Sequence, residues 1–318
     1  MYEPFVVVAA ALLGAVVGSF LNVVIYRLPE GRSLGGRSLC LSCGERIPWF
    51  RNIPVLGWFL LRGRAACCGA RLPFRYPLVE LLTAVLFAVL AWHPPFHPIA
   101  EGDSLDPEGA LAFAFHAAFL SLLVANAFID IDHRILPDAL TKPGMALGIA
   151  ASYLVPGIAG YVIEPDPHGL SPELSSLLSS LLGLLAGFAL VFAIRAGAGR
   201  VFGREAMGFG DVKFLAMIGA FTGWQAALLA FFLACLSGAV IGLVHRVLTR
   251  DSMIPFGPFL ALGALCSLMG SGPILGFLFE TWPAWQRRAG AAPWILGGAA
   301  ILSSFALVIL VRRRRGSS

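Results

Sequence analysis

The sequence has little charge, and this shortage limits the classes of protein to which it can belong. Only 13% of its 318 residues are charged, whereas 58% are hydrophobic, and the mean hydropathy is +0.82. Soluble domains carry about 25% charged residues, so the composition excludes an ordinary soluble globular protein. It predicts an all-α polytopic membrane protein, one that crosses the bilayer several times.

Two other patterns are also missing. The first apolar run has no basic stretch before it and no small-residue cleavage site after it, so we expect a membrane span there and not a cleavable signal peptide. The arginine-rich stretches have no interleaved aromatic residues and no nucleic-acid-binding motif. Nucleic-acid binding therefore has no support in the sequence.

Long apolar runs predict eight to nine transmembrane helices, because a span needs about 17–25 apolar residues. We expect these helices near residues 4–26, 77–92, 110–129, 144–162, 176–194, 212–224, 226–245, 254–279 and 294–311. The chain then divides into a first helix (1–26), a small cytoplasmic domain (27–75, here called the cysteine segment), a transmembrane core (76–280) and a C-terminal helix with a basic tail (281–318).

The charges between the expected spans predict the orientation of the chain. The cysteine segment holds nine arginines against two acids, whereas residues 93–109 and 163–175 hold acids and neither lysine nor arginine. Four consecutive arginines, 312–315, lie near the C-terminus. By the positive-inside rule the N-terminus faces outward, and the cysteine segment and the C-terminus are cytoplasmic. The arginine clusters also suit contact with anionic lipid headgroups.

Two aspartates stand out because an ionised group within a membrane is costly. Asp130 falls at the end of the third expected span, and Asp211 opens the sixth, within "MGFGDVKF". Under the predicted orientation both lie at the cytoplasmic face. Two carboxyl groups at one membrane level suit an aspartic dyad, in which one acts as a base on water and the other as an acid on the carbonyl.

The neighbours of Asp211 suit the same chemistry. Gly208 and Gly210 permit backbone conformations that other residues avoid, and they allow a substrate strand to approach closely. A helix that starts at Asp211 places its carboxylate by the positive end of the helix dipole, and Lys213 adds a nearby cation.

Structural roles also fit these acids when each is taken alone. Asp211 is a suitable N-cap for a helix. Asp132 and Asp138 flank turns, where a solvated or capping role is more common than a catalytic one. The pairing of Asp130 with Asp211 at one face is what favours catalysis.

The motifs of the chain, taken in order, resemble those of the type IV prepilin peptidase family. The similar stretches are "GSFLNVVIYRLP" (18–29), "CLSCGERIPWFRNIPVLGWFLLRGR" (40–64), "RYPLVELLTA" (75–84), "IDIDHRILPD" (129–138), "MGFGDVKFLAMIGAFTGW" (207–224) and "IPFGPFLALG" (254–263). Together they cover roughly residues 14–265.

The resemblance implies an intramembrane aspartic protease of the G-x-G-D type. Its catalytic aspartates correspond to Asp130 and Asp211, and Asp132 matches a nearby acidic position. Members of the family remove the basic leader from type IV prepilins or type II secretion pseudopilins. They then methylate the new N-terminal residue with S-adenosylmethionine, and they reside in the bacterial inner membrane.

The family pattern in this segment is two C-x-x-C pairs, a spacing typical of a zinc site. The cysteine segment of this chain departs from that pattern. Cys40 and Cys43 form the first pair, but the second has Ala65 in its first position, Cys68 in its second, and an extra Cys67. Adjacent cysteines seldom both reach one tetrahedral ion without strain, and residues 27–75 contain no histidine. The alternatives are zinc on all four cysteines, zinc on three thiolates with an outside ligand, or no metal. Disulfides are not expected in a reducing cytoplasm.

Two other functions compete with the peptidase. A transporter or proton relay also uses intramembrane acids, but it predicts acids near the bilayer midplane and inverted repeats. A non-enzymatic assembly scaffold with a zinc module is the third. Asp130 and Asp211 map to one membrane face, which favours the peptidase.

Overall fold

The structure, a computed structural model, describes residues 3–36, 38–93, 106–158, 171–202, 207–249 and 254–276. The expected span at 294–311 and the tail domain at 281–318 lie outside the described residues. The chain divides into two compact units, residues 1–269 and 270–318. The described part of the second unit, 270–276, is the end of the last helix among the described residues.

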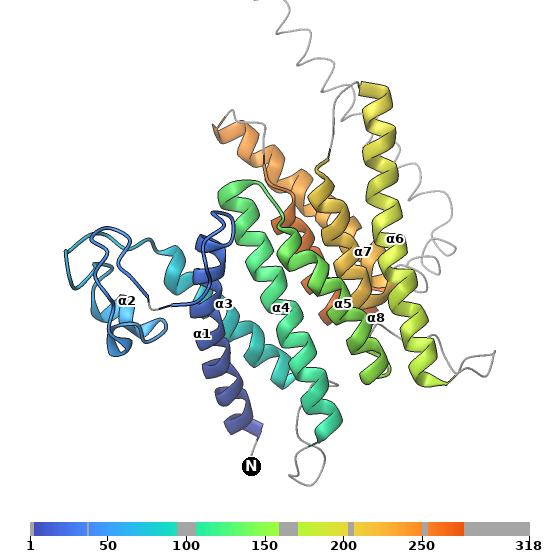
Figure 1. Ribbon diagram of the computed structural model, residues 1–318. Helices are drawn as coiled ribbons and strands as arrows, with labels where there is room; N and C mark the ends of the chain where they lie inside the picture. Colours follow the sequence, from blue (N-terminus) through green and yellow to red (C-terminus); the bar gives the residue numbers. More distant parts are fainter. Residues whose placement is uncertain are drawn as a thin grey trace, which may run out of the picture. The chain divides into compact units, whose positions relative to one another are not determined.

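The described residues are helical apart from turns and two isolated β-bridges (Figure 1). The helices are α1 (Glu3–Arg27), α2 (Leu56–Leu60), α3 (Arg75–Trp92), α4 (Pro107–His133), α5 (Asp138–Leu154), α6 (Pro172–Phe202), α7 (Phe209–Thr249) and α8 (Gly257–Gly276), with a 3₁₀ turn, η1, at Trp49–Arg51. Five of them, α1, α3, α4, α6 and α7, contain a stretch long and apolar enough to cross a membrane. A polytopic helical membrane protein is thereby confirmed.

Helix α7 contains a break at Gly223, where the backbone is not helical (φ 75°, ψ 173°). The two spans expected at 212–224 and 226–245 are thus the two parts of α7, which meet at this residue. A positive φ of this kind is open to glycine and strained for residues with a Cβ atom. The break therefore depends on glycine at this position.

Glycines bring neighbouring helices into close contact, as is common in membranes. A Cβ atom at Gly18 of α1 would lie 2.7 Å from the Cα of Glu80 in α3, and one at Gly183 of α6 would lie 2.1 Å from the carbonyl oxygen of Gly219 in α7. A side chain at either position would therefore push the two helices apart.

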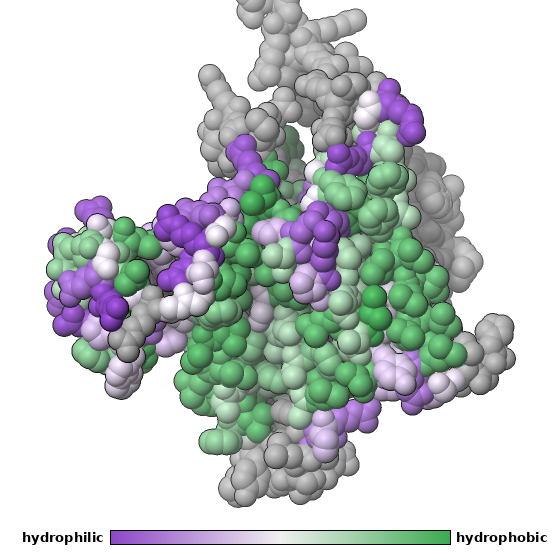
Figure 2. All heavy atoms as spheres, in the orientation of Figure 1, coloured by the Kyte–Doolittle hydropathy of each residue, from purple (hydrophilic) through white to green (hydrophobic). Residues whose placement is uncertain are grey.

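Hydrophobic side chains cover the sides of the helices, whereas polar ones gather over the cysteine segment (Figure 2). Phe5 is 71% exposed and Leu185 60% exposed. The interior is also mainly hydrophobic, but it contains some polar side chains, such as Ser180 of α6, which donates a hydrogen bond to the Ala220 carbonyl of α7 at 2.7 Å. Such a distribution suits a lipid environment, because an apolar outer surface carries no penalty there.

Candidate active site

Asp130 lies in the last turn of α4, as the sequence predicts. Helix α4 ends at His133, since Arg134 takes the left-handed conformation (φ 56°) and Pro137 cannot continue a helix. The Asp130 side chain is buried, and its Oδ2 atom accepts a hydrogen bond of 2.7 Å from the backbone N–H of Gly257. Because Gly257 is the first residue of α8, Asp130 is held by a helix N-terminus.

Asp211 is the third residue of α7, which corrects the expected start of this helix at Asp211. Helix α7 begins at Phe209, so Gly208 takes the capping position. The buried carboxylate of Asp211 reaches back and accepts a hydrogen bond of 3.1 Å from the Gly208 N–H. This arrangement is half of a capping box. The side chain still lies in the first turn, by the positive end of the helix dipole.

The fold brings these two acids together from distant parts of the chain. The carboxyl groups of Asp130 and Asp211 are near enough for a direct charge–charge interaction. Leu136, in the connection between α4 and α5, packs closely on Gly210 of α7. A Cβ atom at Gly210 would lie only 2.9 Å from the Cβ of Leu136, so this connection is fixed next to the two acids. Two acids from two helices therefore share one buried environment.

The expected roles of the two glycines need correction. Neither Gly208 nor Gly210 has a positive φ, so neither provides an unusual backbone conformation here. Gly210 does permit a close approach, but the neighbour is the side chain of Leu136. Gly208 contributes its backbone N–H to Asp211.

Lys213 pairs with Asp138, not with Asp211. Its ammonium group contacts the carboxylate of Asp138, which also lies 2.8 Å from the Nζ atom of Lys142. The hydrogen bond from Lys142, followed by that from Lys213, holds the pKa of Asp138 below its usual value. Asp138 is therefore ion-paired. The capping role expected for it is wrong for α5, because Pro137 occupies the N-cap position of that helix. Lys213 ties the start of α7 to the start of α5.

Asp132 is also ion-paired, and the residue as a whole is exposed, as the expected solvated role requires. Its carboxylate contacts the guanidinium of Arg75, the first residue of α3. Both side chains are largely shielded, being 27% and 24% exposed. The pair links the end of the cysteine segment to the turn of α4 that carries Asp130.

Sequence reasoning missed two participants in this site, the Gly257 N–H and Arg75. The motif "IPFGPFLALG" signals the first, because Pro258 after a glycine is typical of a helix start. The position of Arg75 beside Asp132 has no signal in the sequence, since it depends on how α3 packs on α4.

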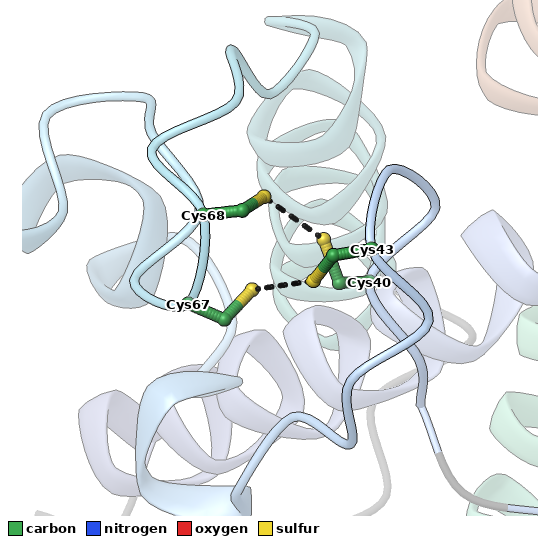
Figure 3. A group of neighbouring side chains, drawn as sticks. All are labelled: Cys40, Cys43, Cys67 and Cys68. Atoms are coloured by element: carbon green, nitrogen blue, oxygen red, sulfur yellow. Dashed lines mark hydrogen bonds between the residues drawn. The ribbon is translucent and has the colours of Figure 1, made fainter.

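The four cysteines of the cysteine segment converge from two similar hairpin turns (Figure 3). One turn is closed by the bridge of Leu39 with Arg46, and the other by that of Arg64 with Arg71. The four sulfur atoms all lie within 4.8 Å of one another, with 3.7 Å between Cys40 and Cys68 and 3.3 Å between Cys43 and Cys67. Despite their adjacency, Cys67 and Cys68 both turn their sulfurs toward the first pair (Figure 3).

This donor set fits a tetrahedral zinc ion. Zn–S bonds of about 2.3 Å place tetrahedral sulfurs about 3.8 Å apart, close to the spacing of Cys40 and Cys68. All four cysteines are free thiols. Backbone N–H groups of Cys43 and Ser42 lower the pKa of Cys40 to about 6, whereas the hydrogen bond with Cys43 and desolvation raise the pKa of Cys67 to about 12. An ion here would take the place of the thiol protons.

Comparison with known proteins adds to this geometry. Residues 12–94 match the family described as the bacterial peptidase A24 N-terminal domain, and residues 117–243 match the type IV leader peptidase family. A relative from Pseudomonas putida is 33% identical over 295 residues, which cover 85% of this chain and 92% of the relative. The chain belongs to the type IV leader peptidase family.

Other relatives carry the same name as the Pseudomonas putida protein, prepilin leader peptidase/N-methyltransferase. The relative from Dichelobacter nodosus is 33% identical and matches over 89% of this chain and 98% of its own length. That from Myxococcus xanthus strain DK1622 is 38% identical over 78% of this chain, and the chain spans 65% of its length. No solved structure matches the chain. The expected family is confirmed, and Asp130, Asp211 and Gly210 all lie inside the leader-peptidase match.

Proposed function

We propose that this member of the type IV leader peptidase family removes the leader from prepilins or pseudopilins and then methylates the new N-terminus. The observation that carries the cleavage proposal is the meeting of two buried carboxyl groups, Asp130 and Asp211, at the ends of α4 and α7. The names of the relatives support both activities.

In this proposal the two aspartates are the catalytic residues. One carboxylate removes a proton from water as the water oxygen attacks the scissile carbonyl, and the other carboxyl group donates a proton to the carbonyl oxygen. Backbone N–H groups of Gly257 and Gly208 each hold one oxygen of the pair. The acids are thus oriented by main-chain atoms at two helix starts, which restricts their side-chain rotation.

We further propose that this site faces the cytoplasm in the bacterial inner membrane, with the N-terminus outside and the C-terminus inside. In support, basic residues gather at the helix ends around the two acids, where Arg75 and Lys213 form ion pairs. The other end of α4 begins at Pro107, is capped by Asp106 and follows a stretch that holds acids and neither lysine nor arginine. Nine spans, the upper end of the expected eight to nine, with the domain division at 27–75, 76–280 and 281–318, agree with this orientation, because an odd number of crossings places the termini on opposite sides.

The cofactors proposed here are zinc and S-adenosylmethionine. Cys40, Cys43, Cys67 and Cys68 would hold the zinc, which would supply folding free energy to a segment with a small core. S-adenosylmethionine would supply the methyl group. Arginines of the cysteine segment would contact anionic lipid headgroups at the same face.

A proton relay gains no support from the fold. Asp130 lies in the last turn of α4 and Asp211 in the first turn of α7, so neither acid is near the middle of its helix. A relay across the bilayer requires acids at intermediate depths.

A cleavage assay tests the proposal directly. Purified protein is incubated with a prepilin peptide and S-adenosylmethionine, and mass spectrometry follows the leader-free product and its methylated form. Asp130→Asn and Asp211→Asn should each abolish cleavage, because an amide neither activates water nor shares a proton. Asp106→Asn is the matched control, since asparagine caps α4 equally well. Wild-type cleavage in either active-site variant would disprove the assignment.

A further inference from the structure

A cavity of about 210 Å³ lies between the cysteine segment and helices α1 and α3. Asn22 of α1 and Glu80 of α3 line its inner part, Trp58 and Tyr76 contribute aromatic surface, and exposed residues of the cysteine segment form its rim. Neither Asp130 nor Asp211 lines it. This cavity is therefore separate from the proposed cleavage site.

Asn22 presents a buried acceptor without a donor. Its side chain is only 3% exposed, and its Nδ2 atom donates a hydrogen bond of 3.0 Å to the Tyr76 carbonyl. The Oδ1 atom of the same amide is buried and has no hydrogen-bond partner. Buried polar atoms are nearly always paired, so this oxygen is available to a donor on a ligand.

Glu80 adds a buried carboxylate whose partners carry no positive charge. Its side chain is 8% exposed, and it accepts hydrogen bonds from the Val55 N–H at 2.6 Å and from the Ser19 hydroxyl. Burying a carboxylate is costly unless a cation accompanies it. A cationic ligand would supply the missing charge.

Val55, which does not line the cavity but donates a hydrogen bond to Glu80, has a strained backbone. It has a positive φ of 63°, which is a genuine outlier for a β-branched residue. The hydrogen bond from its N–H to Glu80 holds it in place. Such strained residues gather at ligand sites, where the surrounding structure maintains them.

We propose that this cavity binds S-adenosylmethionine, with its sulfonium and ammonium groups toward Glu80 and the Oδ1 atom of Asn22. The inference rests on the methyl-transfer half of the proposed function and goes further by assigning the donor's binding residues. Trp58 provides an aromatic face suited to a cation. Arg46, Arg51 and Arg71 line the exposed rim, where a guanidinium suits stacking on the donor's adenine ring.

The size of the cavity restricts which part of the donor lies inside. Sites that enclose a whole drug-sized ligand measure about 300–1,000 Å³, so 210 Å³ accommodates only part of the molecule. The charged methionine end belongs inside, beside Glu80 and Asn22. The adenosine end lies at the rim, against the cysteine segment.

The charge of Glu80 also explains how the product would leave. During transfer the amine lone pair of the new N-terminus bonds to the methyl carbon, the C–S bond breaks, and its electron pair stays on sulfur. The nitrogen becomes positive and then releases one proton to water. The sulfur is now neutral, so the carboxylate of Glu80 loses one of its attractions and binds S-adenosylhomocysteine more weakly.

The position of the cavity suits a substrate released at the aspartates. Tyr76 lines the cavity and directly follows Arg75, whose guanidinium pairs with Asp132. Asp132 is in the same helical turn as Asp130. The cavity and the two aspartates therefore lie at the same end of helices α3 and α4.

Calorimetric titration of the purified full chain tests this proposal. The probes are S-adenosylmethionine and S-adenosylhomocysteine, and the variants are Glu80→Gln and Asn22→Leu. The matched control is Glu30→Gln, which removes a carboxylate that is paired with Arg32 and does not line the cavity. Metal content and thermal unfolding check that each variant folds. The wild type should prefer S-adenosylmethionine by about tenfold or more, and Glu80→Gln should reduce this preference to about twofold or less.

A second measurement uses the wild type alone, in case the variants fail to fold. Ultraviolet cross-linking of radiolabelled S-adenosylmethionine should label peptides that contain residues 19–27, 46–58 or 71–80. Labelling confined to other peptides, or unchanged affinity in folded Glu80→Gln and Asn22→Leu, would overturn the donor site while methylation by the wild type stands. A wild type that cleaves but neither binds the donor nor methylates would instead disprove the methyl-transfer function itself.

Discussion

Gly257→Ala tests whether the N-terminus of α8 positions Asp130. A Cβ atom at this residue would lie 2.7 Å from the Oδ2 atom of Asp130 and 3.1 Å from its Cγ, so the carboxyl group must move. Its hydrogen bond with the Gly257 N–H, 2.7 Å long, is then lost or lengthened. A hydrogen bond to a charged group contributes about 1.5–3 kcal/mol, and about 1.4 kcal/mol corresponds to a tenfold change in rate. We therefore expect cleavage to slow by about 10- to 150-fold.

The assay is the initial rate of leader removal from a saturating prepilin peptide. Gly197→Ala is the matched control, because a Cβ atom at this helical glycine meets nothing within 4 Å and alanine favours helix formation. Methylation of a peptide supplied without its leader serves as a second readout and should fall far less than cleavage. A cleavage rate within about twofold of wild type would refute the argument that Gly257 positions Asp130, and so would an equal loss in Gly197→Ala.

Three further predictions concern the rest of the fold. Cys67→Ser should lower the zinc content, which metal analysis should find at about one ion per chain in the wild type. The same variant should lose more methyl transfer than cleavage. An unchanged zinc content would show that Cys67 is not a zinc ligand. A double-mutant cycle of Arg75→Met and Asp132→Asn should give a coupling energy of about 1 kcal/mol in thermal unfolding, and strict additivity would contradict the ion pair. Gly183→Val should lower the free energy of unfolding by about 1–3 kcal/mol, because a Cβ atom there would lie 2.1 Å from the Gly219 carbonyl oxygen. Gly199→Val is the control and should lower this free energy less, because a Cβ atom at Gly199 meets nothing within 4 Å.

The sequence predicts α1 and α3 well because hydrophobic length is a local property, whereas the span expected at 144–162 is wrong in its start, since α5 runs from Asp138 to Leu154. The apolar runs at 4–26 and 77–92 correspond to α1 and α3 within two residues at either end. The prediction is weaker where the backbone changes direction without a loss of hydrophobicity. The break of α7 at Gly223 separates two expected spans that are joined in one helical element.

The sequence predicts the two acids of the candidate site but not the residues that contact the side chains around them. Asp130 is recognisable because an acid at the end of an apolar run is rare. The partner of Lys213 is not, since Asp138 lies 75 residues away in the chain, and only tertiary packing brings them together. The turning of Cys67 toward Cys43 likewise depends on the shape of a hairpin turn that residue spacing does not specify.

The ion pair of Arg75 with Asp132 bears on the order of the two reactions. Arg75 is the first residue of α3 and the last residue of the cysteine segment, and Asp132 follows Asp130 by two residues in α4. Under the proposed function a free N-terminal amine exists only after the leader is removed, so the proposed methyl-transfer site receives the product of the proposed cleavage site. Because both side chains of the pair are about three-quarters shielded, solvent screens it less than an exposed pair. It therefore joins the end of the cysteine segment to the helical turn that carries Asp130, and under the proposed function this contact keeps the donor cavity beside the aspartates.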